Sequence, residues 1–261
     1  MQINRWSGIA LGLLGLLLAI PVASAKALRI VTIESAPFGF VGSDGKPTGM
    51  MFEIGNLIAT EAGFTYSNQL TPYARSAHAV AHGDADFVLR YSSAELTAAA
   101  IQVAGVLSLP TILVGKAPAK FESLADLHGK TVGTPRGGHF DTAFEADTAI
   151  GKYQVADYSQ MLKMLMNDRF DAGIGSSIGL YYNAQLLGLQ SEQLGKPLVL
   201  STQTFELHFS KKTADKETTV ALRDGVARLR ARHAIRKIVD KYLGSFDWHV
   251  TPREARTVVQ P

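Results

Sequence analysis

The stretch that most constrains the fold is residues 28–63, which has the pattern of a strand, a loop and a helix. Residues 28–33 form a short apolar run rich in β-branched side chains, as in a strand that is buried on both faces. A loop and the turn-forming residues 43–47 follow. Apolar residues then recur at helical spacing until Gly63. A strand-helix unit therefore opens the folded part of the chain.

Strand and helix patterns keep alternating after this unit, with one interruption. The interruption is the apolar stretch 101–116, which Pro110 breaks, and the alternation restarts at Phe121. Alternating strands and helices are typical of a parallel sheet with helices on its faces, so we predict an α/β protein made of two such units. The further strands are expected at 64–70, 85–90, 111–116, 131–134, 153–156, 171–175 and 204–210, and the helices at 73–83, 93–100, 123–127, 138–149, 159–167, 177–187, 215–230 and 233–243.

The N-terminus has the three regions of a secretory signal. Arg5 precedes an apolar run over 9–20, and the small-residue cleavage pattern Ala23-Ser24-Ala25 follows. A membrane anchor is the alternative, but the run is shorter than the ~20 residues that a spanning helix needs. We predict a signal peptide over 1–25, cleaved after Ala25, and a periplasmic protein.

Composition limits the partners and the chemistry. The chain has no cysteine, so an exported protein of this size must be held together by apolar burial, and no lipid-anchoring cysteine follows the signal. The formal net charge is +3, and the most basic segment, 223–241, fits one solvated helix face. Without an aromatic platform, this segment gives no reason to expect nucleic-acid binding. We expect a freely soluble monomer.

Four segments resemble one protein family, in the same order and at similar spacing. They are the opening unit 28–63, FESLADLHGKTVGTPRGG (121–138), RFDAGIGSSIGLYY (169–182) and LRDGVARLRARHAIRKIVDKYLG (222–244). These segments are similar to the extracellular solute-binding proteins of polar amino-acid ABC transporters. The likeness is collinear over residues 28–244, which is nearly all of the predicted mature chain.

The resemblance implies a fold, a mechanism and a partner. The fold would be two-lobed, with a mostly parallel sheet flanked by helices in each lobe and two hinge crossovers. Lobe 1 would comprise 26–113 plus 206–261, and lobe 2 would comprise 114–205. The lobes would close on a small-molecule ligand and exclude water from it. The partner would be the membrane permease of an ABC transporter, and no cofactor, metal or catalytic residue is expected.

Candidate ligand contacts lie in the loops after strands, where α/β sheets gather ligands. By the resemblance, Phe38 and Tyr73 occupy positions of an apolar or aromatic wall, although a core position is equally open for Phe38. The family's carboxylate-binding arginine would fall at Ala98, and the charge appears instead at Arg90, at a strand end. A salt bridge within the protein is the other interpretation of Arg90.

Two further positions depart from the family. Ser176 falls where the family has the aspartate that receives the ligand's ammonium group. Gly138-His139 replaces a Thr/Ser pair at the start of the helix predicted over 138–149, where with Arg136 it would suit an anion. We therefore predict a small polar or anionic ligand other than a standard α-amino acid, with amino-acid-like compounds left open. The predicted ligand-binding residues are Phe38, Tyr73, Arg75, Arg90, Ser92, Ser93, Arg136, Gly138, His139, Ser176 and Ser177.

Other functions remain open. A Gly-x-Ser-x-Gly pattern surrounds Ser177, and Asp224 and His233 follow in hydrolase order, but the spacing leaves no room for the remaining hydrolase strands. His78 and His82 have the spacing of a metal-binding pair, yet no third ligand is in view, so a solvated helix face is the better interpretation. A dehydratase-like enzyme and a sensory module on the same fold stay as alternatives.

Overall fold

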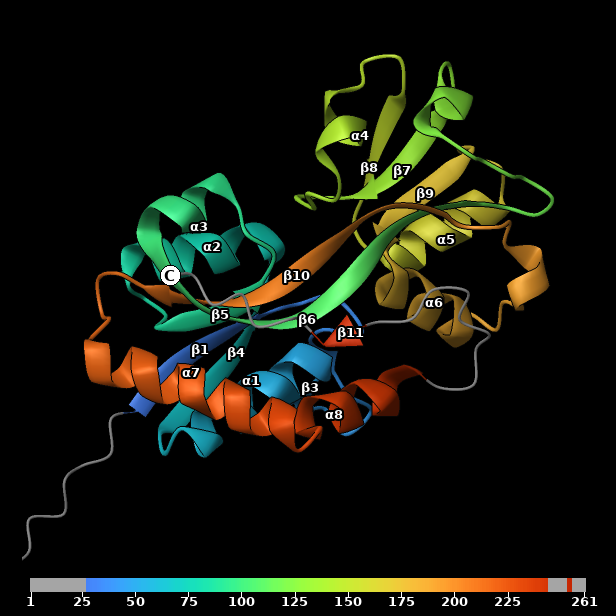
Figure 1. The fold of residues 1–261 in the computed structure, drawn as a ribbon. Coiled ribbons are helices and arrows are strands. Elements are labelled where there is room, and N and C mark those ends of the chain that lie inside the picture. Colours follow the sequence, from blue (N-terminus) through green and yellow to red (C-terminus); the bar gives the residue numbers. More distant parts are fainter. Residues whose placement is uncertain (1–26, 244–252, 255–261) are drawn as a thin grey trace, which may run out of the picture.

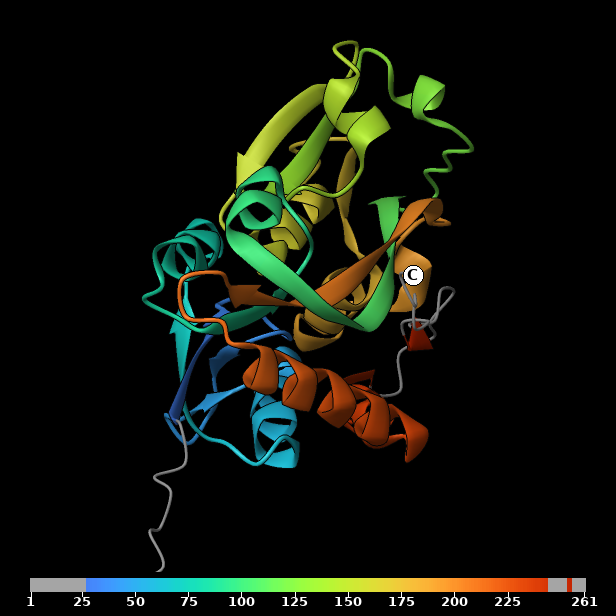
Figure 2. The ribbon, with the colours of Figure 1, turned by 60° about the vertical axis from the view of Figure 1, so that its left-hand side comes forward.

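The structure, a computed structural model, describes residues 27–243 and 253–254 and contains two α/β regions (Figure 1). One region holds the N-terminal elements, drawn in blue and teal, together with the orange C-terminal helices. The other holds the yellow-green elements, and Figure 2 shows it above the first. The predicted signal peptide, 1–25, lies outside the described residues.

The elements have the following bounds. The strands are β1 (Ala27–Ile33), β2 (Phe40–Val41), β3 (Pro47–Thr48), β4 (Thr65–Thr71), β5 (Phe87–Arg90), β6 (Ala100–Gly115), β7 (Thr131–Pro135), β8 (Gly151–Val155), β9 (Ala172–Ser176), β10 (Leu198–Ser210) and β11 (Arg253–Glu254). The helices are α1 (Met50–Glu61), α2 (Tyr73–His82), α3 (Ala94–Ala99), α4 (Thr142–Ala146), α5 (Tyr158–Met166), α6 (Ser177–Leu186), α7 (Lys216–Ala231) and α8 (Ala234–Leu243), with short 3₁₀ turns at Leu124–Leu127 and Ser191–Gln193.

One sheet runs through both regions in the order β4-β1-β5-β10-β6-β9-β7-β8. In the first region β1 pairs in parallel with β4 and β5, and in the second β7 pairs in parallel with β8 and β9. The long strands β6 and β10 pair antiparallel with each other and connect the regions. The predicted fold class, with two crossing strands, is therefore confirmed. The predicted lobe boundaries at 113/114 and 205/206 fall inside β6 and β10 and stay a prediction.

The crossing strands are longer than the sequence predicted, because Pro110 does not break β6. It lies opposite Thr202 of β10, one residue before β6 begins to pair with β9 at Thr111. A proline cannot donate to a ladder, and at this position β9 does not yet require a hydrogen bond from β6. The strand expected over 111–116 therefore begins at Ala100.

The helix expected over 138–149 was also wrong in extent. The Asp141 side chain accepts a hydrogen bond from Phe144 N (3.0 Å) and caps α4, which begins only at Thr142. Residues 136–140 therefore form a loop after β7 and not the first turn of a helix, and anion binding by Arg136, Gly138 and His139 stays a prediction.

Helices cover both faces of the parallel strands. In the first region α1, α7 and α8 lie below the sheet in Figure 1, and α2 and α3 lie above it. Leu28 and Ile30 of β1 and Ile54 and Ile58 of α1 are at most 2% exposed and pack in one apolar core. Full burial of each such side chain stabilises the fold by about 1.5–3 kcal/mol.

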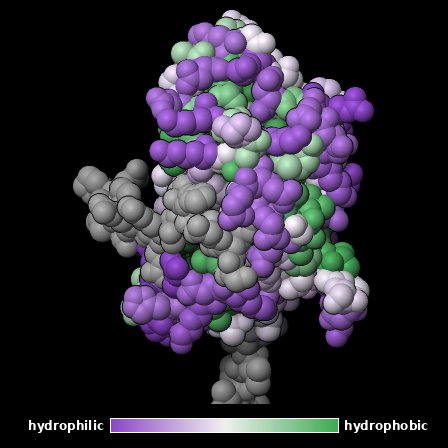
Figure 3. Space-filling view, turned by 90° about the vertical axis from the view of Figure 1, so that its right-hand side faces the viewer, coloured by the Kyte–Doolittle hydropathy of each residue, from purple (hydrophilic) through white to green (hydrophobic). Residues whose placement is uncertain are grey.

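The outer surface is mostly polar on the face that Figure 3 shows, with apolar residues in separate patches. Large exposed apolar side chains within the described residues are spread over several elements, as at Val41, Tyr153 and Leu186. None of the helices in the described part of the chain is both long and apolar enough to cross a membrane.

Candidate functional site

A cavity of about 320 Å³ lies between the two regions and is lined by residues of both. We call Phe38, Tyr73, Tyr91 and Phe205 its first wall, and Arg136, Gly138, Phe140, Tyr158 and Ser176 its second wall. The remaining lining residues are Ile33, Glu34, Ser35, Pro72, Ala74, Pro135, Gly137 and Ala156. Six aromatic rings therefore surround the space, three of them from tyrosines.

Phe38 is held at the first wall by the start of α1. The free N–H of Met51 in the first turn of α1 donates to the Phe38 carbonyl at 2.8 Å. Gly49 permits this approach, because its φ is 126° and a Cβ there would lie 2.6 Å from the same carbonyl oxygen. The Phe38 ring stacks on Phe205 with 5.1 Å between centroids. Phe38 is thus both a core residue and a lining residue.

Arg90 lies beneath Tyr73 and does not line the cavity. Its guanidinium carbon is 4.1 Å from the centroid of the Tyr73 ring. The same group donates to the Tyr73 carbonyl at 3.0 Å and to Ser76 Oγ at 2.7 Å. Because Arg90 is only 2% exposed, its visible role is to support the Tyr73 ring, and contact with a ligand stays a prediction.

His208 of β10 lies beside this buried cation. It is 2% exposed, its Nε2 has no hydrogen-bond partner in the described part of the chain, and Glu206 Oε2 is 3.7 Å away. Burial, and to a smaller extent the charge of Arg90, lower the pKa of His208 to about 4. His208 is therefore neutral at pH 7, which avoids a second positive charge next to Arg90.

The polar groups of Tyr158 and Ser176 on the second wall are satisfied within the protein. Tyr158 Oη accepts from Ser176 N at 3.2 Å and is 3.3 Å from Ser176 Oγ, which in turn accepts from Gly179 N at 3.2 Å. Burial raises the pKa of Tyr158 to about 12, so the phenol stays neutral. Neither group offers a charge to a ligand ammonium.

Arg136 and Glu34 are the charged residues of the lining, and both are exposed. Arg136 lies in the loop after β7 and Glu34 directly after β1, so each occupies the carboxyl end of a strand. Neither side chain forms an ion pair or hydrogen bond within the described residues. The cavity therefore offers one free cation and one free carboxylate, and sequence reasoning missed Glu34 although its place after a strand marks it.

Two contacts join the regions beside the cavity. Gly137 lies against Tyr73, since a Cβ at Gly137 would be 3.4 Å from Tyr73 Cδ1. Asn183 of α6 donates from Nδ2 to the Ala36 carbonyl at 2.9 Å. The structure thus shows the two sides of the cavity in contact.

The structure gathers only some of the predicted site residues. Phe38, Tyr73, Arg136, Gly138 and Ser176 line the cavity, whereas Arg75, Arg90, Ser92, Ser93, His139 and Ser177 do not. Sequence reasoning did not single out Glu34, Tyr91, Phe140, Tyr158 or Phe205. Tyr91 and Phe140 lie after strands, where their position could have marked them, whereas Tyr158 starts α5 and Phe205 lies on β10, where only an aromatic ring could have marked them.

Most of the predicted residues outside the lining have partners in the protein. Ser92 Oγ donates to Glu206 at 2.6 Å, and Ser93 Oγ caps α3 by accepting from Leu96 N. His139 is exposed and pairs with Glu145 at 3.3 Å. Ser177 is fully buried, so its hydroxyl is not positioned as an accessible nucleophile.

The spaced histidines on α2 do not form a metal cluster. The rings of His78 and His82 stack on each other with centroids 3.8 Å apart. Within the described residues no group of three or more His, Cys, Asp or Glu side chains could hold a metal ion.

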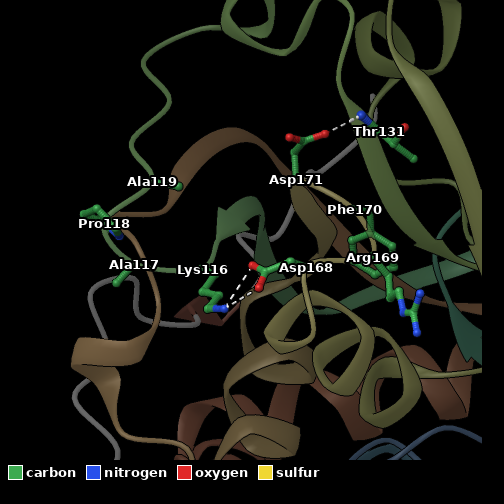
Figure 4. A pocket seen from close by; sticks show the side chains of 9 residues that line it. All are labelled: Lys116, Ala117, Pro118, Ala119, Thr131, Asp168, Arg169, Phe170 and Asp171. Atoms are coloured by element: carbon green, nitrogen blue, oxygen red, sulfur yellow. Dashed lines mark hydrogen bonds and ion pairs between the residues drawn. The ribbon is translucent and has the colours of Figure 1, made fainter.

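A second hollow, of about 580 Å³, lies on the surface of the second region around Lys116 and Phe170 (Figure 4). Several of its polar groups are paired with one another. Lys116 Nζ is 2.8 Å from Asp168 Oδ2, and Thr131 N donates to Asp171 Oδ2 at 2.8 Å. Although it is larger, this hollow has a single aromatic ring, from Phe170, and is a weaker candidate than the cavity.

Two α/β regions that are joined by crossing strands and enclose a cavity define the fold of the two-lobed periplasmic binding proteins, and solved structures agree. A histidine kinase sensor domain with similarity to these proteins has a TM-score of 0.72 at 18% identity, over 85% of this chain and 98% of that chain. The substrate-binding protein of an amino acid ABC transporter has a TM-score of 0.69 at 17% identity, over 84% and 100%. An ABC uptake transporter substrate-binding protein from Streptococcus pneumoniae with bound histidine has a TM-score of 0.70 at 18% identity, over 85% and 94%.

The chain belongs to the bacterial extracellular solute-binding proteins, family 3, whose model matches residues 28–245. The resemblance seen in the sequence is thus confirmed, and the protein is a solute-binding protein by family and fold. No curated protein matches the chain. The solved structures above share the fold at low identity, so they do not transfer a ligand.

Proposed function

We propose that this protein captures a small solute that has a flat or apolar body and a negatively charged group, and delivers it to the membrane permease of an ABC transporter. The observation that carries the proposal is the cavity lining. Six aromatic rings and Arg136, whose charge has no ion-pair partner among the described residues, surround about 320 Å³.

The size and chemistry of the cavity support this class of ligand. Its volume is at the lower end of the range of about 300–1,000 Å³ for ligand sites, which favours a small metabolite over a peptide. Aromatic rings stabilise a flat body by stacking, and a guanidinium binds a carboxylate through two parallel hydrogen bonds. Glu34 lies in the same lining and would repel a second negative charge, so a monoanion fits better than a dianion.

A standard α-amino acid fits less well, although solved relatives include amino-acid transport proteins and one with bound histidine. Ser176 has no charge, and its hydroxyl is engaged by Tyr158 and Gly179. Ala98, where the family's arginine would fall, is exposed on α3 and does not line the cavity. Among the charged residues of the lining, only Glu34 could receive an ammonium group.

A thermal-shift panel tests the ligand class. The mature protein is screened with aromatic and aliphatic monocarboxylates, standard amino acids, phosphorylated compounds and sugars, and hits are measured by calorimetry. Monocarboxylates with an apolar body should bind, and Arg136→Gln should weaken them by at least about tenfold, since a charge-assisted hydrogen bond is lost. Lys116→Gln in the surface hollow is the matched control. Binding confined to ordinary amino acids, or equal loss in both variants, would contradict the proposal.

Transport and sensing share this fold, so they need a separate experiment. Once the solute is known, a strain that lacks the protein should lose uptake of the labelled solute and keep any transcriptional response to it. The opposite result would favour a sensory module. Sequencing the N-terminus of the exported protein checks the proposed cleavage after Ala25. Sedimentation of the mature protein in the analytical ultracentrifuge checks the proposed monomer.

A further inference from the structure

Tyr91 lines the cavity, and its buried hydroxyl is an unused polar group. Tyr91 follows the last residue of β5, lines the cavity and packs its ring on Phe205 with 4.3 Å between centroids. The residue is 5% exposed, and its hydroxyl has no hydrogen-bond partner in the part of the chain that the structure describes. Buried polar groups are nearly always hydrogen-bonded, so an orphaned phenol beside a cavity requires an explanation.

The surroundings of Tyr91 keep its hydroxyl protonated, so it can act as a hydrogen-bond donor. Burial raises the pKa of Tyr91 well above its usual value, and the nearby phenols of Tyr158 and Tyr73 raise it further. All three tyrosines line the cavity. The Tyr158 hydroxyl is already hydrogen-bonded to Ser176. The Tyr91 hydroxyl keeps its proton and has no acceptor for a hydrogen bond in the described residues.

We propose that Tyr91 is a specificity-determining residue, and that its hydroxyl donates a hydrogen bond to an uncharged oxygen of the ligand, such as a hydroxyl or carbonyl group. Arg136 and Tyr91 belong to different walls of the cavity, and Arg136 is exposed whereas Tyr91 is buried. The ligand is then a small, flat or apolar monoanion with a second oxygen away from its charged group. This inference rests on the proposed function and narrows its ligand class.

The energetic reason is the asymmetry of buried hydrogen bonds. A ligand that reaches Tyr91 with an oxygen satisfies the phenol, whereas an otherwise identical ligand without that oxygen leaves it unsatisfied. Sites that are built to hydrogen-bond a substrate hydroxyl reject the analogue that lacks it much more strongly than apolar pockets reject a hydroxyl. The cavity should therefore discriminate within pairs of compounds that differ by one oxygen.

Calorimetry with matched probe pairs on wild type and Tyr91→Phe tests this inference. The pairs are benzoate and 4-hydroxybenzoate, phenylacetate and 4-hydroxyphenylacetate, and L-phenylalanine and L-tyrosine. In at least one pair the wild type should bind the hydroxylated member at least about tenfold more tightly. Tyr91→Phe, which removes only the oxygen, should abolish that preference and leave the affinity for the other member unchanged. The inference is overturned if no pair shows a preference, if the preference survives in Tyr91→Phe, or if no pair binds.

An unfolding measurement without ligand separates recognition from a structural role. Tyr91→Phe should raise the urea midpoint, because the variant no longer buries an unsatisfied hydroxyl. Tyr158→Phe, which removes a hydroxyl that is bonded to Ser176, should lower it and serves as the matched control. A lower midpoint for Tyr91→Phe would show that its hydroxyl has a partner in the protein and would overturn the inference. If an anionic probe binds through Arg136 without any oxygen preference, the proposed function stands and only this inference fails.

Discussion

The two walls of the cavity differ in how their polar groups are used. In the first wall Phe38 and Tyr91 pack on Phe205, Tyr73 rests on the buried Arg90, and the Tyr91 hydroxyl is buried without a hydrogen-bond partner in the described residues. On the second wall the Tyr158 and Ser176 hydroxyls bond to each other, and its free charge is the exposed Arg136. In the proposed function, this difference means that the first wall recognises the shape and an oxygen of the ligand and that the second wall recognises its charge.

The largest effect expected is a loss of folding stability at acidic pH, through His208 beside the Arg90 that supports the Tyr73 ring of the first wall. The folded-state pKa of His208 is about 4, below its ordinary value of about 6.5, so the neutral form stabilises the fold. This contribution is fully present above pH 6.5 and is lost as the pH falls from 6.5 through 4. At 1.36 kcal/mol per pKa unit, it amounts to about 3 kcal/mol. Urea unfolding at pH 7.0, 5.5 and 4.0 measures the loss.

The variant His208→Gln isolates this effect. It removes the titrating group, and carboxylates that titrate in the same range contribute to both proteins alike. The difference in unfolding free energy between wild type and variant should therefore shrink by about 3 kcal/mol between pH 7 and pH 4. A difference that is constant with pH would show that His208 is not kept neutral by its burial beside Arg90, and the contrast between the walls would lose this support.

The second wall should also be sensitive to added volume. The Tyr158 ring lies between two glycines, and a Cβ at Gly175 would be 2.3 Å from Tyr158 Cε1. Gly175→Ala should destabilise the protein by about 1–3 kcal/mol, because the buried ring cannot move without breaking its bonds to Ser176. Urea unfolding measures the change. Gly225→Ala in α7 is the control, since its nearest neighbour would be at 3.5 Å, and it should stabilise by about 0.5–1 kcal/mol. Equal stability of Gly175→Ala and wild type would contradict a fixed ring.

The sequence predicts the order of strands and helices well, because apolar periodicity survives in single elements such as β1 and α6. It fails where tertiary pairing overrides a local signal. The polar residues 201–204 are part of β10 because β6 pairs with them, and nothing local to those residues indicates it. Asp141, in contrast, is a recognisable cap, and weighing it would have placed the start of α4 correctly.

The site shows the same division. Position after a strand correctly brought Tyr73 and Arg136 to the cavity, because topology sets which loops meet. It could not give the direction of a side chain. Arg90 and Tyr91 are adjacent at the same strand end, yet Arg90 turns under Tyr73 and Tyr91 lines the cavity. Neighbouring residues of an extended chain point to opposite sides, so one of the two had to be absent from the lining, and the sequence does not say which.

The hydrogen bond between Asn183 and Ala36, which joins the two regions, should contribute less to the free energy of unfolding than the effects above. Asn183 is 5% exposed and its Nδ2 donates to the Ala36 carbonyl across the regions. Asn183→Ala should destabilise by about 1 kcal/mol, the net value of one hydrogen bond, and should increase the radius of gyration of the unliganded protein. Urea unfolding and solution X-ray scattering measure both effects. The exposed Gln185→Ala on the same helix is the control, and identical scattering curves for the two variants would show that this bond does not hold the walls together.

The smallest effect is expected for a substitution at Glu34. It tests whether only the second wall recognises the charge of the ligand. Glu34 is exposed, lines the cavity and is bonded to nothing else in the described residues, so Glu34→Gln should change stability by less than about 0.5 kcal/mol. For a monoanionic ligand the variant should raise affinity by no more than about fivefold, since an exposed charge pair contributes up to about 1 kcal/mol, and added salt should reduce the gain. Calorimetry at two salt concentrations measures this, with the exposed Glu95→Gln on α3 as control. A loss of affinity would instead mean that the ligand also carries a cationic group that Glu34 receives, and recognition of charge would then be divided between the region of β1 and the second wall.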